Sequence, residues 1–237
     1  MQTQDLEFGY FAHPGEGALP GVVLIHDVWG LQEHPRELAR RLAAEGFGVL
    51  AVDLYRRESE LRIVDPGAWM RELSDPEVLR DLQTAVDFVA AEPGCRGRGV
   101  GVVGFCMGGT YALLAGCSCS GVSAAVPFYG LLSHEHGLLH REGGLDPAKK
   151  PRQPLDAVAD LRCPLLGFFG AQDEYVPLAD VEELERRLAT TGKPAEVVVY
   201  PDAGHAFLND TRPDAFRPEA ARDAWTRMLA FLGERLR

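Results

Sequence analysis

Residues 104–109, Gly-Phe-Cys-Met-Gly-Gly, lie between an apolar run, 100–103, that predicts a buried strand and a run, 110–115, that predicts the start of a helix. Gly-x-Cys-x-Gly between a strand and a helix is the pattern of a nucleophile elbow, with cysteine where serine is commoner. The two outer glycines fit such a tight turn, because side chains two residues either side of the nucleophile would collide. A glycine-rich turn around a core cysteine is the alternative, and the flanking strand and helix favour the elbow.

An elbow of this kind would turn the Cys106 thiol outward at the carboxyl end of a sheet and at the positive end of the following helix. That position favours a thiolate, and it places the Met107 N–H beside an oxyanion that develops on a bound substrate.

The rest of the sequence alternates strand and helix patterns around this turn. Short apolar runs predict strands at 6–12 (an edge strand), 21–25, 47–54, 100–103, 122–129, 164–170 and 196–200. Helical spacing predicts helices at 33–45, from Asp75 as the capping residue to Pro93, at 178–189 and at 218–236, with a polar loop at 56–67 and an irregular segment at 130–154. The alternation predicts an α/β fold, with a mainly parallel sheet and helices on both faces. Without a linker or an internal repeat, we expect one domain over 1–237.

Composition limits the possible partners. The 237 residues, 46% of them hydrophobic, suffice for one large core, and the net charge of −11 disfavours nucleic acid and anionic membranes as partners. No signal peptide pattern and no apolar run long enough to span a membrane are visible, so we expect a cytoplasmic protein. We also expect a monomer. The five cysteines are an odd number in a chain of this size, so we expect no disulfide framework and interpret all but Cys106 as buried thiols.

Five residues suited to catalysis lie in loops that follow four of the predicted strands. Asp27 and Val28 follow the strand 21–25, and Cys106, Asp173 and His205 come later in that order, each in a loop beyond a strand. Because parallel strands present their carboxyl ends at one edge, we expect these residues to meet there. Asp173 would accept Nδ1–H of His205, and His205 would present Nε2 to the thiol. The Val28 N–H would join the Met107 N–H as the second oxyanion donor.

Aromatic residues near these loops are candidates for a substrate pocket. We expect Trp29, Tyr55 and Tyr129 to line it, whereas Trp69 fits the pocket and the core equally well. A metal site is a weaker interpretation of one histidine cluster, which consists of His134, Glu135, His136 and His140. That cluster lacks the helical His-Glu-x-x-His spacing, which favours a solvated loop beside the site.

The motifs around 104–109, Gly170-Ala171-Gln172-Asp173 and Gly204-His205-Ala206-Phe207 together resemble the dienelactone hydrolase (carboxymethylenebutenolidase) family of α/β-hydrolases over nearly the whole chain. The resemblance implies hydrolysis of cyclic or activated esters through a thioester, without a metal or an organic cofactor. It also implies Cys106 as nucleophile, Asp173 as acid and His205 as base, with the N–H groups of Met107 and Val28 as the oxyanion hole.

Two positions depart from the family pattern. Asp27 stands where the family has a glutamate that holds the resting thiol, so the resemblance implies a thiol-switch role for a carboxylate that is one methylene shorter. Asn209 stands in the substrate pocket where the dienelactone enzyme has an arginine that holds a substrate carboxylate, and an amide cannot form a charged bidentate clamp. Arg212 and Arg71 are the candidates to replace that arginine.

These observations predict a cysteine-dependent hydrolase of lactones or activated esters whose substrate is a small molecule. One alternative is a general carboxylesterase or thioesterase with the same mechanism. Another is a redox-sensing or binding protein that has the same fold but whose exposed thiol is oxidised rather than acylated. Asp173 and His205 favour the hydrolase, because a sensor needs only an acidic thiol.

Overall fold

One mixed sheet forms the centre of the molecule. The computed structural model describes residues 1–15 and 17–237, and in this part of the chain eight strands pair in the order β1-β2-β4-β3-β5-β6-β7-β8. Only β2 runs against the others, since both of its pairings are antiparallel and the remaining pairs are parallel. The strands are β1 Gln2–Leu6, β2 Gly9–His13, β3 Gly21–Ile25, β4 Gly48–Val52, β5 Val100–Phe105, β6 Val122–Phe128, β7 Leu165–Gly170 and β8 Ala195–Tyr200.

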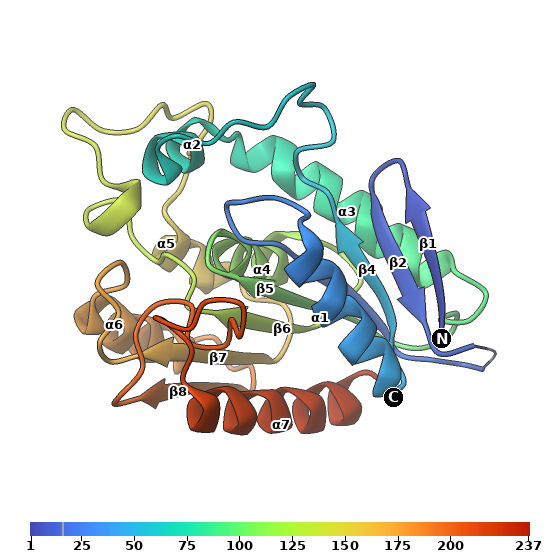
Figure 1. The fold of residues 1–237 in the computed structure, drawn as a ribbon. Coiled ribbons are helices and arrows are strands. Elements are labelled where there is room, and N and C mark those ends of the chain that lie inside the picture. Colours follow the sequence, from blue (N-terminus) through green and yellow to red (C-terminus); the bar gives the residue numbers. More distant parts are fainter. Residues whose placement is uncertain (16) are drawn as a thin grey trace.

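Helices cover both faces of this sheet. The helices are α1 Glu33–Ala44, α2 Pro66–Glu72, α3 Asp75–Ala91, α4 Met107–Ser118, α5 Pro154–Ala157, α6 Leu178–Leu188 and α7 Pro218–Arg235, with short 3₁₀ turns at η1 Gly137–Leu139 and η2 Val158–Asp160. Figure 1 shows α1 and α7 on one face and α3 and α4 on the other. The predicted fold class, a mainly parallel α/β sheet covered on both sides, is confirmed.

The central elements are apolar because they are covered from both sides. Every residue of β3, β4 and β5 is buried, and α4 is buried from Met107 to Cys117. Continuous apolar runs are typical of such strands, and the sequence showed them without alternation. All five cysteines are free thiols and buried.

Strand order brings the predicted site residues to one edge. β4 lies on one side of β3 and β5 on the other, so the crossover direction reverses between β3 and β5. Ligands bind beyond the carboxyl ends of the strands at such a switch point. The loops that follow β3, β5, β6, β7 and β8 carry Val28, Cys106, Tyr129, Asp173 and His205, respectively.

Two local predictions are wrong. The expected edge strand 6–12 is a hairpin, in which β1 and β2 pair antiparallel from Gln2↔His13 to Leu6↔Gly9. Phe8 occupies the turn and packs edge-on against Phe88, with ring centroids 5.2 Å apart. β2 is therefore the second strand, and Gly9 is needed there because a Cβ would lie 2.4 Å from the Ala51 carbonyl oxygen.

Asp75 is not a helix cap. Ser74 occupies the cap position of α3, and Asp75 is the first helical residue. Its Oδ1 accepts a 2.6 Å hydrogen bond from Lys150 Nζ and a 2.8 Å bond from the Tyr111 hydroxyl. The buried Lys150 ammonium group thus engages the Asp75 carboxylate, which a helix cap would need to accept backbone N–H groups. α2, which begins inside the expected loop 56–67, was also not predicted.

No helix in the described part of the chain is long and apolar enough to cross a bilayer.

Candidate active site

The turn between β5 and α4 holds Cys106 in a strained backbone conformation. Its φ of 55° is in the left-handed region that non-glycine residues seldom adopt. A Cβ on Gly104 would lie 1.9 Å from the Gly108 carbonyl oxygen, and a Cβ on Gly108 would lie 2.3 Å from the Ile25 carbonyl oxygen. The glycines are therefore required by close backbone approach, as the elbow interpretation predicts.

Cys106 opens onto a cavity at the carboxyl edge of the sheet. The cavity has a volume of about 210 Å³, and its walls come from the loops after β3, β5, β6, β7 and β8, from α1 and from the segments around Pro66 and Leu138. Cys106 is 8% exposed, so the thiol is reached only through this cavity. His205 lines the same space.

Asp173 and His205 meet as the chain order suggests. The Nδ1 atom of His205 lies 2.8 Å from Oδ2 of Asp173. The other carboxylate oxygen accepts backbone N–H groups from Tyr175 at 2.8 Å and Val176 at 3.1 Å. The Asp173 side chain is fully buried. These bonds fix the carboxylate, and the carboxylate in turn fixes the imidazole so that Nδ1 carries a hydrogen.

The electrostatics of His205 depend on Cys106. Burial lowers the pKa of His205, but the negative charge of a Cys106 thiolate, the hydrogen bond that His205 donates to Asp173 and contact with the sulfur outweigh it and raise that pKa to about 10. The buried Nε2 atom has no partner of standard hydrogen-bond geometry in the described structure. The sulfur thus interacts with the ring without a standard hydrogen bond, and Nε2 remains available to a substrate atom in the cavity.

Two tyrosine rings flank the imidazole. Tyr129 and Tyr175 each meet His205 in a T-shaped arrangement, with centroids 5.1 and 5.0 Å from the ring. Among the described residues, the three non-glycine residues with positive φ are Cys106, Tyr129 and Ala206, and all three line the cavity. Strained backbone concentrates at functional sites, which supports this cavity as the site.

The loop after β3 places Val28 against the cavity, opposite the first turn of α4. Val28 is buried and lines the cavity, and Met107 is the first residue of α4, where backbone N–H groups have no partner inside the helix. The Asp27 carboxylate, expected at the thiol, accepts the Trp29 N–H at 2.9 Å. That bond lies within the loop itself.

The predicted pocket residues separate into two groups. Trp29, Tyr129 and Asn209 line the cavity, and Trp29 is 47% exposed at its mouth. Tyr55 is not part of the lining: it is buried behind the β3 loop, where its hydroxyl lies 3.1 Å from the Val28 carbonyl oxygen. Trp69 is half-buried and packs edge-on against Tyr55, with centroids 5.4 Å apart.

The two candidate arginines differ in the same way. Arg212 lines the cavity and is ion-paired with Asp214 at 3.0 Å. Arg71 is outside the lining and donates to the Leu138 carbonyl at 2.6 Å. Asn209 uses its Oδ1 internally, as an acceptor for the Thr211 N–H at 3.0 Å.

Three polar cavity residues were not predicted as site residues. His26, directly after β3, His34, in the first turn of α1, and Tyr175 all line the cavity. Tyr175 stands two residues after Asp173 in the same loop, which was a usable signal, whereas the inward direction of His34 depends on the packing of α1.

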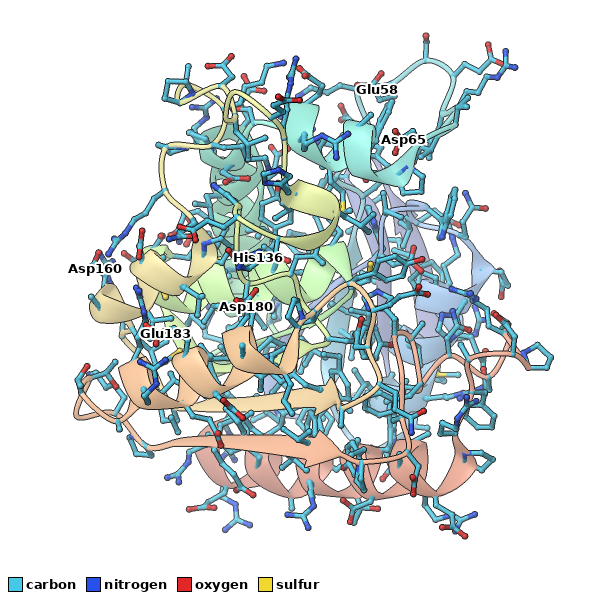
Figure 2. The ribbon with its side chains drawn as sticks, turned by 90° about the vertical axis from the view of Figure 1, so that its left-hand side faces the viewer. Glu58, Asp65, His136, Asp160, Asp180 and Glu183 are labelled. Atoms are coloured by element: carbon cyan, nitrogen blue, oxygen red, sulfur yellow. The ribbon has the colours of Figure 1, made fainter. Side chains whose placement is uncertain are left out.

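The histidine cluster at 134–140 does not form a metal centre in the described structure. Across residues 1–15 and 17–237, no three His, Cys, Asp or Glu side chains converge as metal ligands. Figure 2 shows His136 close to Asp180, at the N-terminal end of α6. Burial raises the pKa of Asp180.

Comparisons with known proteins show the family to which this chain belongs. The model of the "Dienelactone hydrolase family" matches residues 8–236. A protein of Escherichia coli strain K12 named "Putative carboxymethylenebutenolidase" is 34% identical over 232 residues, which cover 93% of this chain and 79% of that protein. A "Probable 2-oxo-3-(5-oxofuran-2-ylidene)propanoate lactonase" of Bradyrhizobium sp. is 33% identical over 94% of this chain and 87% of that protein.

A solved structure from the same family also resembles this chain. The crystal structure of a "Putative Dienelactone Hydrolase" from Klebsiella pneumoniae superposes with a TM-score of 0.84 at 34% identity, covering 95% of this chain and 92% of that one. With a family model that matches almost the full length and relatives above 30% identity, the chain belongs to the dienelactone hydrolase family.

Proposed function

We propose that this protein hydrolyses lactones or activated esters through a thioester on Cys106. One observation carries the proposal: within a single cavity, the imidazole of His205 interacts with Cys106 on one side and lies 2.8 Å from the Asp173 carboxylate on the other. Membership of the dienelactone hydrolase family supports ester or lactone hydrolysis as the reaction class.

Acylation begins with the thiolate–imidazolium pair that the raised pKa of His205 favours. The sulfur attacks the substrate carbonyl carbon, and the carbonyl electrons move onto oxygen. The N–H groups of Val28 and Met107 hold that oxyanion. When the tetrahedral intermediate collapses, the C–O bond breaks and the leaving oxygen takes the proton from His205 Nε2. In a lactone, the new hydroxyl stays attached to the acyl chain, so the ring opens without losing a fragment.

Deacylation uses the same groups in reverse. Neutral His205 takes a proton from water, and the hydroxide oxygen attacks the thioester carbon. The same two N–H groups hold the second oxyanion, after which the C–S bond breaks and the thiolate leaves. The acid product is released, and the imidazolium again faces the thiolate. Asp173 stabilises each imidazolium without taking its proton.

The cavity supports a small substrate. Its volume of about 210 Å³ is below the roughly 300 Å³ at which pockets for drug-sized ligands begin. A single-ring lactone or a short activated ester fits this space, which favours lactone hydrolysis over a general carboxylesterase for long acyl chains. Arg212 is the cation in the lining and the residue we propose to contact a substrate carboxylate, in place of Asn209. A cytoplasmic location and a monomeric state stay predictions.

Replacement of the nucleophile tests the proposal. We expect Cys106→Ala to abolish turnover of small lactones and p-nitrophenyl esters while the protein stays folded, because no other side chain forms the acyl intermediate. Cys163→Ala is the matched control, since Cys163 is a buried free thiol outside the cavity lining. Undiminished turnover by Cys106→Ala would exclude the mechanism. Reversible oxidation of Cys106 without any turnover in the wild-type protein would support the redox-sensing alternative.

A further inference from the structure

Two buried side chains hold the peptide groups on either side of Val28. The Nδ1 atom of His26 lies 2.6 Å from the carbonyl oxygen of Asp27, and the Tyr55 hydroxyl lies 3.1 Å from the carbonyl oxygen of Val28. The first carbonyl belongs to the same peptide group as the Val28 N–H. With both flanking peptide planes held, the direction of that N–H is fixed.

The tautomer of His26 follows from its second contact. The Leu54 N–H points at Nε2 of His26 at 3.2 Å, so Nε2 is the acceptor and Nδ1 carries the hydrogen that is donated to Asp27. His26 is 1% exposed, and burial lowers its pKa, which keeps the ring neutral. Through these two bonds His26 joins the loop after β3 to the loop after β4.

Tyr55 reaches both sides of the proposed oxyanion hole. Besides the Val28 carbonyl, its hydroxyl contacts Sδ of Met107 at 3.1 Å, so two acceptors share one hydroxyl donor. The ring is 5% exposed and packs against His26, with centroids 5.0 Å apart, and against Trp69. This packing leaves the hydroxyl little freedom to move away.

We propose that His26 and Tyr55 are positioning residues for the oxyanion hole. This inference rests on the proposed function, because it assigns a role relative to the Val28 and Met107 N–H groups. A hydrogen bond accepted by the Asp27 carbonyl also polarises the Val28 N–H of the same peptide group, which makes it a better donor to a developing oxyanion. Tyr55 is outside the cavity lining, and His26, which is part of the lining, has both ring nitrogens engaged by the Asp27 carbonyl and the Leu54 N–H, so neither needs to touch the substrate.

The first test removes the Tyr55 hydroxyl and keeps the ring. We expect Tyr55→Phe to lower kcat on a small lactone about tenfold, with KM unchanged, since loss of a whole oxyanion donor costs about 100-fold to 1,000-fold. Acylation and deacylation each form an oxyanion, so kcat falls whichever step limits turnover. Tyr10→Phe is the matched control: Tyr10 lies on β2, outside the cavity lining, is 6% exposed against 5% for Tyr55, and accepts a hydrogen bond from Arg40 of α1 at its hydroxyl.

A second reaction of the same thiol separates positioning from general disturbance. Methyl methanethiosulfonate reacts with a thiolate at sulfur, releases methanesulfinate and forms no carbonyl oxyanion. We expect its rate with Cys106 to be equal in the wild-type protein, Tyr55→Phe and Tyr10→Phe. Equal loss of thiolate reactivity and of hydrolysis in Tyr55→Phe would overturn the inference, because the thiol itself would then be disturbed. So would a kcat for Tyr55→Phe equal to that of Tyr10→Phe.

His26 has its own matched pair of variants. Asparagine can offer an amide N–H near the position of Nδ1, while leucine has nearly the same shape and offers none; both lose the acceptor for Leu54. We expect His26→Asn to retain about tenfold more kcat than His26→Leu, a part of the roughly 100-fold to 1,000-fold that loss of a whole oxyanion donor costs. Equal kcat in the two variants would overturn the role of His26. Retained turnover in Cys106→Ala would instead remove the proposed function beneath the inference, and the two failures are therefore distinguishable.

Discussion

Two buried carboxylates among the described residues each hold a basic side chain, and the two pairs differ in the space beside them: about 210 Å³ at His205 but about 10 Å³ at Asp75 and Lys150. Asp173 lies 2.8 Å from His205, and Asp75 lies 2.6 Å from Lys150; the side chains of Asp173, Asp75 and Lys150 are at most 7% exposed. In the second pair, the Tyr111 hydroxyl contacts both charged groups and closes the network. In the first pair, Nε2 of the imidazole keeps no standard partner.

This difference shows why burial and charge alone do not identify an active site. The pKa of Lys150 is lowered because burial outweighs the attraction of Asp75, whereas the pKa of His205 is raised to about 10 because the Cys106 thiolate adds to the effect of Asp173. The shift of Lys150 is therefore dominated by burial and that of His205 by charge pairing. An unsatisfied atom that opens onto a cavity distinguishes the pair that can exchange a proton with a ligand.

The largest expected effect comes from the open pair. We expect Asp173→Asn to lower kcat on a small lactone by about 1,000-fold to 10,000-fold, because an amide stabilises neither the imidazolium nor the required tautomer. The thermal unfolding midpoint should change little, since an asparagine oxygen still accepts the Tyr175 and Val176 N–H groups. Steady-state kinetics measure the expected fall in kcat, and thermal unfolding measures the expected small change in the midpoint. A kcat within a few-fold of wild type would remove the distinction between the pairs.

The closed pair should give the opposite pattern. We expect Lys150→Met to lower the free energy of unfolding by about 3–5 kcal/mol, because it leaves the Asp75 carboxylate buried without its cation. The kcat of the folded fraction should stay near the wild-type value. Denaturant unfolding provides the measurement, and Asp75→Asn/Lys150→Met is the control, which should regain much of the loss because both charges are gone. A loss of kcat as large as that of Asp173→Asn would place Lys150 in the catalytic network.

The third prediction concerns Arg212, the arginine in the cavity lining. For a lactone that carries a carboxylate, we expect Arg212→Gln to raise KM about tenfold, the cost of a lost charge-assisted contact, and to leave KM for a neutral lactone unchanged. Arg71→Gln is the matched control, because Arg71 lies outside the cavity lining. The measurement is KM for the charged lactone and KM for the neutral lactone in each of the two variants. Equal effects on the charged and the neutral lactone would exclude Arg212 as the carboxylate contact.

The smallest effect concerns pH. Protonated His205 predominates below its pKa of about 10 and is lost above it, so the group that protonates the leaving oxygen disappears as pH rises through that value. We therefore expect kcat/KM for a lactone with an alkoxide leaving group to fall on approaching pH 10. The p-nitrophenyl ester, whose leaving group needs no proton, should fall less. Parallel pH profiles for the two substrates would contradict the role of His205 as general acid.

The sequence identified the open pair because its residues sit in local motifs. Gly104, Gly108 and the order of Cys106, Asp173 and His205 follow from strand-to-turn chemistry, and parallel strands bring such turns to one edge. The same reasoning missed the closed pair, in which Asp75 and Lys150 are separated by 75 residues and joined only by packing.

Side-chain direction accounts for the other differences. Tyr55 was expected in the pocket from its place after β4, but residues around a strand end point to alternate sides and sequence alone does not say which side is open. The β1–β2 hairpin was missed because its turn at Glu7-Phe8 carries neither glycine nor proline, the usual signals. The resemblance to the family implied that the Asp27 carboxylate holds the resting thiol. In the structure, the bond that this carboxylate makes is to the Trp29 N–H.

The most direct measurement of the central claim is the site of the acyl group. Wild-type protein mixed with p-nitrophenyl acetate, quenched in acid during the burst and digested, should yield an acetyl group on the peptide that contains Cys106. Neutral hydroxylamine should remove it, as it does a thioester. An acetyl group on another residue, or turnover with no acyl group at any quench time, would contradict the account.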